Sequence, residues 1–221
     1  MQRLGTDYID LLLIHWPDHN TPIPETIAAL EELKKAGKIR HYGVSNYDVA
    51  MMTIAEQHGH LTASQVGYNM FDRRMERQVL PLCLERKIGY MAYGSLAYGL
   101  LSGAMTAETK FADWDWRYAG TAFGLPIFQK EELARELRVV ERLKQMAADH
   151  GRTVAQMAIA WVLGHPALTV ALVGMCTPRE VEEDTAALDW KLSAADRAEI
   201  DRIFAREGVP TYTDAPQAQA R

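Results

Sequence analysis

The sequence has few cysteines, no long apolar run and fewer basic than acidic residues. Its two cysteines, Cys83 and Cys176, have no spacing typical of a metal site or a disulfide framework, so we expect a reducing compartment and no metal ion. No stretch approaches the roughly 20 apolar residues that cross a bilayer, and no basic segment followed by an apolar signal core begins the chain. These absences predict a cytoplasmic protein that has no membrane partner.

The balance of charge argues against nucleic-acid binding. The 221 residues include 24 Lys and Arg against 29 Asp and Glu, for a formal net charge of -5. The basic cluster at 34–40 lies near an expected helix C-terminus, where the helix dipole favours cations. With 48% hydrophobic residues, a chain of this length can bury a core of its own. We therefore expect a single domain over 1–221 and no nucleic-acid partner.

An apolar run that ends abruptly in polar and aromatic residues is the most informative stretch. Residues 11–14 are Leu-Leu-Leu-Ile, and His15 and Trp16 follow directly. Short continuous apolar runs are typical of buried strands in parallel sheets, and α/β proteins place their chemistry at the C-terminal ends of such strands. His15 is therefore a candidate site residue, although a histidine after one strand, taken alone, is more often structural.

The alternation of strand, polar tip and helix repeats along the chain, which predicts parallel strands joined by helices. Residues 97–130 break this rhythm, and their glycine and aromatic content predicts an ordered lid loop. Residues 210–221 are expected to form a frayed tail. The further strands are expected at 39–44, 63–66, 88–92 and 168–173, and helices at 47–58, 76–86 and 130–150. One more helix is expected to end before Gly37, and three more are expected to begin after the caps Thr153, Thr177 and Ser193.

Polar or glycine-rich residues follow every expected strand, and in a parallel barrel these tips meet on one face. Asn46 and Gln65 could bind a carboxamide while Tyr93 stacks on the ring that carries it. A helix that begins at Thr177, with Arg179 beside it, could bind an anion. Each residue alone is a common cap or turn residue. The presence of such residues after every expected strand nevertheless predicts a site for a flat polar heterocycle.

Several motifs resemble those of the aldo-keto reductases. Residues 11–18 are similar to that family's IHWPD segment, and residues 37–46 to its GKIRxxGVSN run. Residues 65–69, 93–103 and 173–184 resemble its QxxYN, YxxLxxGLLxG and GxxxPxxxEN motifs, in the family's order. The resemblance implies a (β/α)8 TIM-barrel fold of the α/β class. This chain would hold only its last five βα units, strands 4 to 8.

The resemblance also implies an oxidoreductase that reduces aldehydes or ketones with NADPH. His15 would help to polarise the carbonyl of a small-molecule substrate, and Trp16 would line its pocket. Glu180 and Asp184 depart from the family's pattern, where Arg or Gln and Asn are usual, so use of NADH becomes possible. The cofactor-binding residues implied are Ser45, Asn46, Gln65, Tyr93, Gly94, Ser95, Leu96, Leu100, Gly174, Thr177, Arg179, Glu180, Glu183 and Asp184.

The same resemblance implies an N-terminal truncation. The family's catalytic set is an Asp, a Tyr, a Lys and a His, and the first three precede the IHWP strand, so this chain would keep only His15. We therefore expect impaired activity of the chain alone, and barrel edges that favour self-association or a partner chain. The alternatives are a non-catalytic nicotinamide-cofactor-binding or regulatory module, and a gene remnant.

Overall fold

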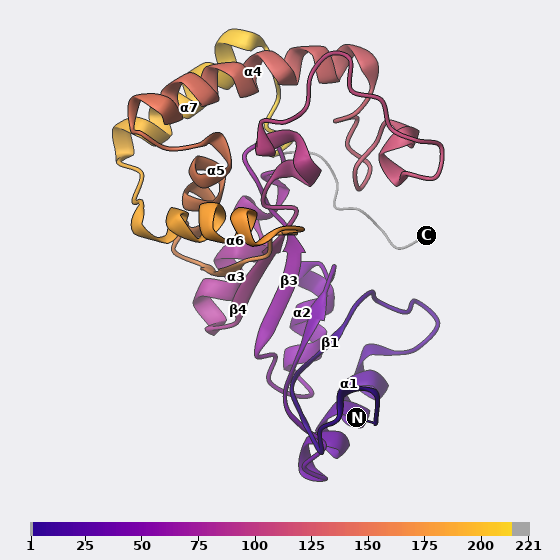
Figure 1. The fold of residues 1–221 in the computed structure, drawn as a ribbon. Coiled ribbons are helices and arrows are strands. Elements are labelled where there is room, and N and C mark those ends of the chain that lie inside the picture. The colour runs from indigo at the N-terminus through magenta and orange to yellow at the C-terminus, as the bar shows by residue number, and fades with distance from the viewer. Residues whose placement is uncertain (1, 214–221) are drawn as a thin grey trace.

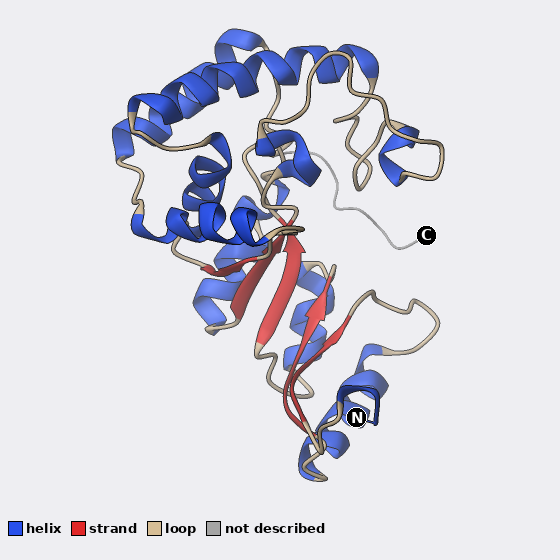
Figure 2. Cartoon of the chain, in the orientation of Figure 1, coloured by secondary structure: helices blue, strands red, loops and turns tan. Residues whose placement is uncertain are grey.

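Five parallel strands in sequential order form the centre of the structure, a computed structural model that describes residues 2–213 (Figure 1). The sheet order is β1-β2-β3-β4-β5, so each strand pairs with the one before it in the chain. Figure 2 shows the arrowheads of the central strands pointing toward the loops and helices at the top. The predicted α/β class with parallel strands is confirmed. The strands are β1 (Ile9–Ile14), β2 (Ile39–Ser45), β3 (Ala63–Gly67), β4 (Gly89–Tyr93) and β5 (Leu168–Ala171).

Helices connect these strands and then gather beyond β4. In Figure 1, α4 and α7 lie side by side at the top, above α5 and α6. Short 3-10 helices mark the turns between the main elements. The α-helices are α1 (Ile23–Lys35), α2 (Val49–Glu56), α3 (Val79–Arg86), α4 (Lys130–Asp149), α5 (Val154–Leu163), α6 (Pro178–Thr185) and α7 (Ala194–Glu207). The 3-10 helices are η1 (Gln2–Leu4), η2 (Arg74–Arg77), η3 (Ala97–Ser102), η4 (Trp116–Ala119) and η5 (Ala186–Asp189).

Side-chain caps determine where the last helices begin. The Thr153 hydroxyl accepts a hydrogen bond from the Gln156 amide at 3.2 Å, and the Gln156 side chain accepts one from the Thr153 amide at 3.1 Å. The same reciprocal capping box opens α6 at Thr177 and α7 at Ser193. Each box satisfies two amides that have no partner within the helix. The starts of these helices were therefore predicted correctly from local sequence.

The core lies between the sheet and its helices. Gly43 shows how closely the strands approach, because a Cβ atom built there would lie 2.2 Å from the Ala63 carbonyl oxygen. Such contact excludes any side chain, so β2 needs glycine at this position. The fully buried side chains of this core include Tyr42, Val44, Met52, Leu80, Tyr90 and Ala92.

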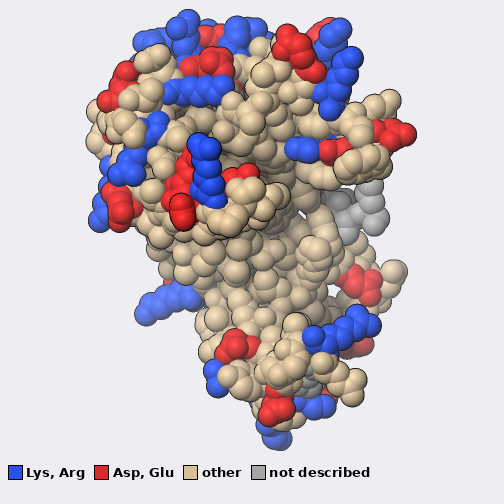
Figure 3. All heavy atoms as spheres, viewed as in Figure 1, with Lys and Arg blue, Asp and Glu red and all other residues tan. Residues whose placement is uncertain are grey.

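The strand β1 differs from the prediction of a buried strand. Five of its six residues are half-buried and Asp10 is exposed. Within residues 2–213, β1 pairs with β2 alone, so no strand covers its other edge. The apolar run 11–14 is therefore an edge of the sheet. Figure 3 shows charged side chains over the upper helices and at the lower end, whereas the middle of this face is largely uncharged.

The loop at 97–130 folds back toward the strand tips. Its two 3-10 helices, η3 and η4, are tied together because Arg117 Nη1 donates a hydrogen bond to the Tyr98 carbonyl at 3.1 Å. Of the expected tail at 210–221, residues 214–221 lie outside the described residues, whereas the Thr211 carbonyl accepts a hydrogen bond from the Arg73 amide. Within residues 2–213, every helix is too short or too polar to cross a membrane.

Candidate functional site

Asn46 links the tips of three strands. Its Nδ2 donates hydrogen bonds to the His15 carbonyl oxygen at 3.0 Å and to Ser45 Oγ at 3.1 Å. Its Oδ1 accepts a hydrogen bond from the Tyr93 hydroxyl at 2.8 Å. The backbone of Asn46 has φ 62°, a left-handed conformation that asparagine tolerates better than most residues. One side chain thus joins the ends of β1, β2 and β4.

The third strand, β3, joins the same network through Gln65. The Gln65 carbonyl accepts hydrogen bonds from Ser45 Oγ at 2.7 Å and from the Asn46 amide at 3.1 Å. The side chain of Gln65 is half-buried and has no hydrogen-bond partner among the described residues. The amides of Asn46 and the hydroxyl of Ser45 are engaged already, so Gln65 is the member of this group best able to bind a carboxamide.

His15 and Trp16 lie at the tip of β1, as the sequence predicts. His15 is exposed and Trp16 is half-buried, with their ring centroids 6.4 Å apart. The Asn46 bond to its carbonyl fixes the backbone of His15 at the strand end. The imidazole is therefore accessible to solvent beside the ring of Trp16. This position suits a hydrogen bond to a ligand better than a structural role.

An aromatic residue of the loop at 97–130 packs against the side chains at the strand tips. The ring of Phe123 lies 6.3 Å from Trp16, 5.1 Å from Tyr93 and 5.4 Å from Tyr98, measured between centroids. Burial, together with the charge of Asp72, raises the pKa of Tyr93 to about 12. Tyr93 therefore stays protonated at neutral pH, as its hydrogen bond to Asn46 requires.

A buried ion pair holds the loop at 97–130 in place and was not predicted from the sequence. Arg74 Nη2 lies 2.7 Å from Asp72 Oδ2, and both side chains are nearly inaccessible to solvent. Arg74 Nη1 donates a hydrogen bond to the Phe123 carbonyl at 3.1 Å. Phe123 and Gly124 both have positive φ, at 48° and 82°. The glycine at position 124 was the available local signal for this turn.

A groove of about 560 Å³ extends from the tip of β4 to α6. Ser95, at its base, is buried and donates a hydrogen bond to the Ala92 carbonyl at 3.1 Å. Tyr98 and Cys176 also line the groove, and neither was singled out as a site residue from the sequence. The predicted cofactor residues that line it are Gly94, Ser95, Leu96, Gly174, Glu180, Glu183 and Asp184.

The other predicted cofactor residues lie outside this groove. Leu100 is fully buried in the core, and Arg179 is exposed on α6. The N-terminus of α6 already has a negative partner, because Glu180 Oε2 accepts hydrogen bonds from the amides of Cys176 at 2.6 Å and Thr177 at 3.2 Å. Thr177 caps this helix rather than offering a free anion site.

Three carboxylates make the α6 end of the groove acidic. Asp184 is buried, and burial, followed by the charges of Glu183 and Glu180, raises the pKa of its carboxyl. An added phosphate here would meet like charges. Within residues 2–213, no group of three potential metal ligands from His, Cys, Asp and Glu side chains comes together.

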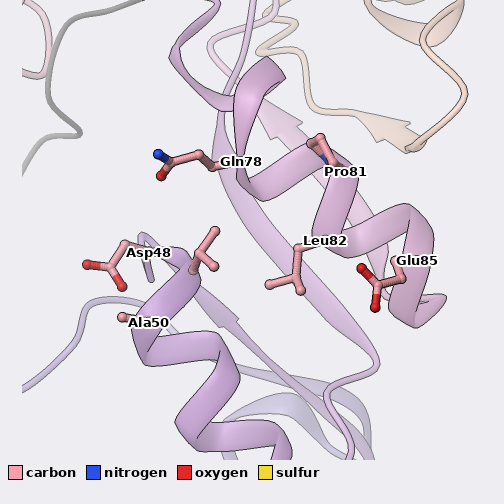
Figure 4. Close-up of a pocket in the computed structure, with 7 residues that line it drawn as sticks. Asp48, Ala50, Gln78, Pro81, Leu82 and Glu85 are labelled. Carbon is pink, nitrogen blue, oxygen red and sulfur yellow. The ribbon is translucent and has the colours of Figure 1, made fainter.

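A second groove lies on the helix side of the sheet and contains none of the predicted residues. It has a volume of about 640 Å³ and lies between α2 and α3 (Figure 4). Asp48, Ala50, Gln78, Pro81, Leu82 and Glu85 are among its lining residues. Most of the predicted residues thus lie at the strand tips and in the adjoining groove, with Leu100, Thr177 and Arg179 as the exceptions.

Comparison with known proteins identifies relatives over most of the chain. The profile of the Aldo/keto reductase family matches residues 1–205. Aldo-keto reductase YhdN of Bacillus subtilis is 39% identical over 205 residues, which cover 92% of this chain and 60% of that protein. The NADH-specific methylglyoxal reductase of Escherichia coli is 37% identical, with 89% of this chain and 59% of that protein covered.

Solved structures match the fold. The glycerol dehydrogenase AKR11B4 from Gluconobacter oxydans gives a TM-score of 0.87 at 32% identity, covering 100% of this chain and 64% of that chain. An aldo-keto reductase from Klebsiella pneumoniae in complex with NADPH gives 0.70 at 30% identity, with 100% and 64% covered. This chain therefore spans only about 60% of the length of the curated relatives.

Proposed function

Because the chain belongs to the aldo/keto reductase family, we propose that it binds a nicotinamide dinucleotide and serves the reduction of aldehydes or ketones to alcohols. The observation that carries this proposal is the groove beside the strand tips, which is lined by half of the fourteen predicted cofactor residues. Relatives whose names include NADPH or NADH support the same cofactor class.

The residues present fit such a cofactor from end to end. The free amide of Gln65 suits the carboxamide, and the ring of Tyr93 suits stacking against the nicotinamide. Gly174 lines the groove, and a Cβ built there would meet no atom within 4 Å, which allows a pyrophosphate to approach the backbone closely. Glu183 and Asp184 would then lie at the adenosine end.

The chemistry of this site needs a hydride and a proton. The hydride for the carbonyl carbon of the substrate would come from a reduced nicotinamide held beside Gln65 and Tyr93. His15 would donate a hydrogen bond to the carbonyl oxygen, which polarises the carbonyl and stabilises negative charge on that oxygen. We assign the family's Asp, Tyr and Lys to no residue of this chain, so we propose that full turnover needs further chain from a longer protein or a partner.

We further propose that NADH binds more tightly than NADPH. Carboxylates beside an adenosine ribose accept hydrogen bonds from its hydroxyls, whereas a 2′-phosphate there is repelled. Glu180→Gln should narrow the difference between the two dissociation constants several-fold. Glu182→Gln, on the same helix but outside the groove, is the matched control and should leave both constants unchanged. Tighter binding of NADPH by the unaltered chain would contradict this preference.

The decisive experiment is titration of the chain with NADH and NADPH, followed by the fluorescence of the reduced nicotinamide. Gly174→Trp should weaken binding at least tenfold, because a Cβ at Gly174 meets no atom within 4 Å and the indole would fill the groove. Ala50→Trp fills the groove between α2 and α3 instead and should have no effect. Equal effects of both variants, or no binding by the unaltered chain, would overturn the proposal.

A second candidate function is a non-catalytic cofactor-binding or regulatory module. The half-buried edge strand β1, which offers a surface to a partner chain, favours it. Aldehyde-dependent oxidation of NADH or NADPH separates the two functions. Turnover by the chain alone would exclude the module, whereas cofactor binding without turnover supports it. If the chain is a gene remnant, we expect neither cofactor binding nor turnover.

A further inference from the structure

Tyr98 carries two unfavourable features at one residue. Its backbone has φ 58°, inside the left-handed region that a tyrosine rarely adopts. Its hydroxyl oxygen is buried and has no hydrogen-bond partner among the described residues. Each feature costs free energy, and such costs persist where function or the surroundings require them. Arg117, which binds the Tyr98 carbonyl, holds the residue in this conformation.

The hydroxyl of Tyr98 lies where the groove meets the strand tips. A Cβ built on Gly94 would lie 2.7 Å from Tyr98 Cε1, so the ring packs directly against the backbone at the end of β4. A Cβ built on Gly67, at the end of β3, would lie 3.3 Å from the hydroxyl oxygen and 3.0 Å from Tyr93 Cε2. The unpartnered hydroxyl is therefore next to Tyr93, and Tyr98 also lines the groove.

Resting on the proposed function, we propose that Tyr98 is a further cofactor-binding residue, whose hydroxyl donates a hydrogen bond to an oxygen of the nicotinamide half of the dinucleotide. That half carries ribose and phosphate oxygens that could accept this hydrogen bond. Burial raises the pKa of Tyr98 well above its ordinary value, so the hydroxyl remains a donor at neutral and moderately alkaline pH.

The chain contains a matched control for this hydroxyl. Tyr90 is also a buried tyrosine whose hydroxyl has no partner, but its side chain is fully enclosed in the core and does not line the groove. Replacement of either tyrosine by phenylalanine removes one unpartnered oxygen and leaves the ring. Neither replacement should therefore lower the melting temperature. Only the hydroxyl of Tyr98 can affect a ligand in the groove.

The test measures dissociation constants of NADH, NADPH and ADP for the unaltered chain, Tyr98→Phe and Tyr90→Phe. We expect Tyr98→Phe to weaken the binding of both dinucleotides about tenfold. The binding of ADP should not change, because ADP lacks the nicotinamide half. Tyr90→Phe should change no constant. Unchanged dinucleotide binding by Tyr98→Phe, or equal weakening of ADP, overturns the role of Tyr98 while leaving the proposed function intact. Binding of neither dinucleotide by the unaltered chain overturns both.

Discussion

The strand β1 and the helix α5 are both apolar, but α5 is buried and β1 is only half-buried. In α5, every residue from Val154 to Val162 is buried. In β1, Leu11, Leu12 and Leu13 remain half-buried, because β2 is their sole strand partner in the described residues. Burial thus depends on what lies beside an element as much as on its sequence.

The largest expected effect comes from truncating matched side chains in these two elements. Met157→Ala in α5 should lower the free energy of unfolding by about 3 kcal/mol, because it leaves a cavity in a fully buried site. Leu13→Ala in β1 should cost about 1 kcal/mol, since water already reaches that side chain. Urea denaturation of both variants measures the difference. Equal losses would mean that another surface covers β1 in solution.

The well-buried helical region also contains an energetically unfavourable group, a buried carboxyl in α4, so it differs from β1 in more than burial. Glu136 is fully buried, and neither carboxylate oxygen has a hydrogen-bond partner among the described residues. Burial, followed by the charge of Glu132, raises the pKa of Glu136 to about 9. The native state therefore holds a proton that the unfolded chain releases above its ordinary pKa of about 4.5.

Stability should consequently fall as pH rises from about 4.5 to 9, because the native state binds more protons than the unfolded state over that range. Glu136→Gln cannot ionise, so it should remove this dependence and raise the free energy of unfolding at pH 8. Denaturation at pH 6 and pH 8 checks the sign. Glu132→Gln removes only the smaller cause of the raised pKa and should reduce the fall without abolishing it. A fall that persists in Glu136→Gln would contradict the assignment.

The fold was predictable wherever local sequence determines it. The caps at Thr153, Thr177 and Ser193 define helix starts through contacts within three residues, and the structure confirms them. The third helix was less predictable: the segment expected from 76 begins as the 3-10 helix η2, and α3 starts at Val79 after the non-helical Gln78. Burial of β1 was predicted wrongly, because neighbouring strands and not local residues decide it.

The candidate site was predictable as far as motifs mark it. His15, Asn46 and Gln65 meet at the strand tips because parallel strands bring their ends to one edge. The contact between Arg74 and the Phe123 carbonyl joins residues 49 positions apart, and no local pattern announces it. The unpartnered hydroxyl of Tyr98 is likewise a property of packing. Such features appear only when distant segments are placed together.

Two equivalent capping boxes provide the smallest expected effect and the finest comparison. Thr177→Ala and Ser193→Ala should each lower the free energy of unfolding by about 1 kcal/mol, because each removes an oxygen that accepts a hydrogen bond from a helix amide.

The box at Thr177 adjoins the groove, whose lining includes Glu180, whereas the box at Ser193 does not. Thr177→Ala should therefore also weaken dinucleotide binding several-fold, and Ser193→Ala should not. Thermal unfolding and fluorescence titration separate these effects. Equal binding by both variants would mean that the start of α6 supports the fold alone and that the cofactor is held from the strand tips.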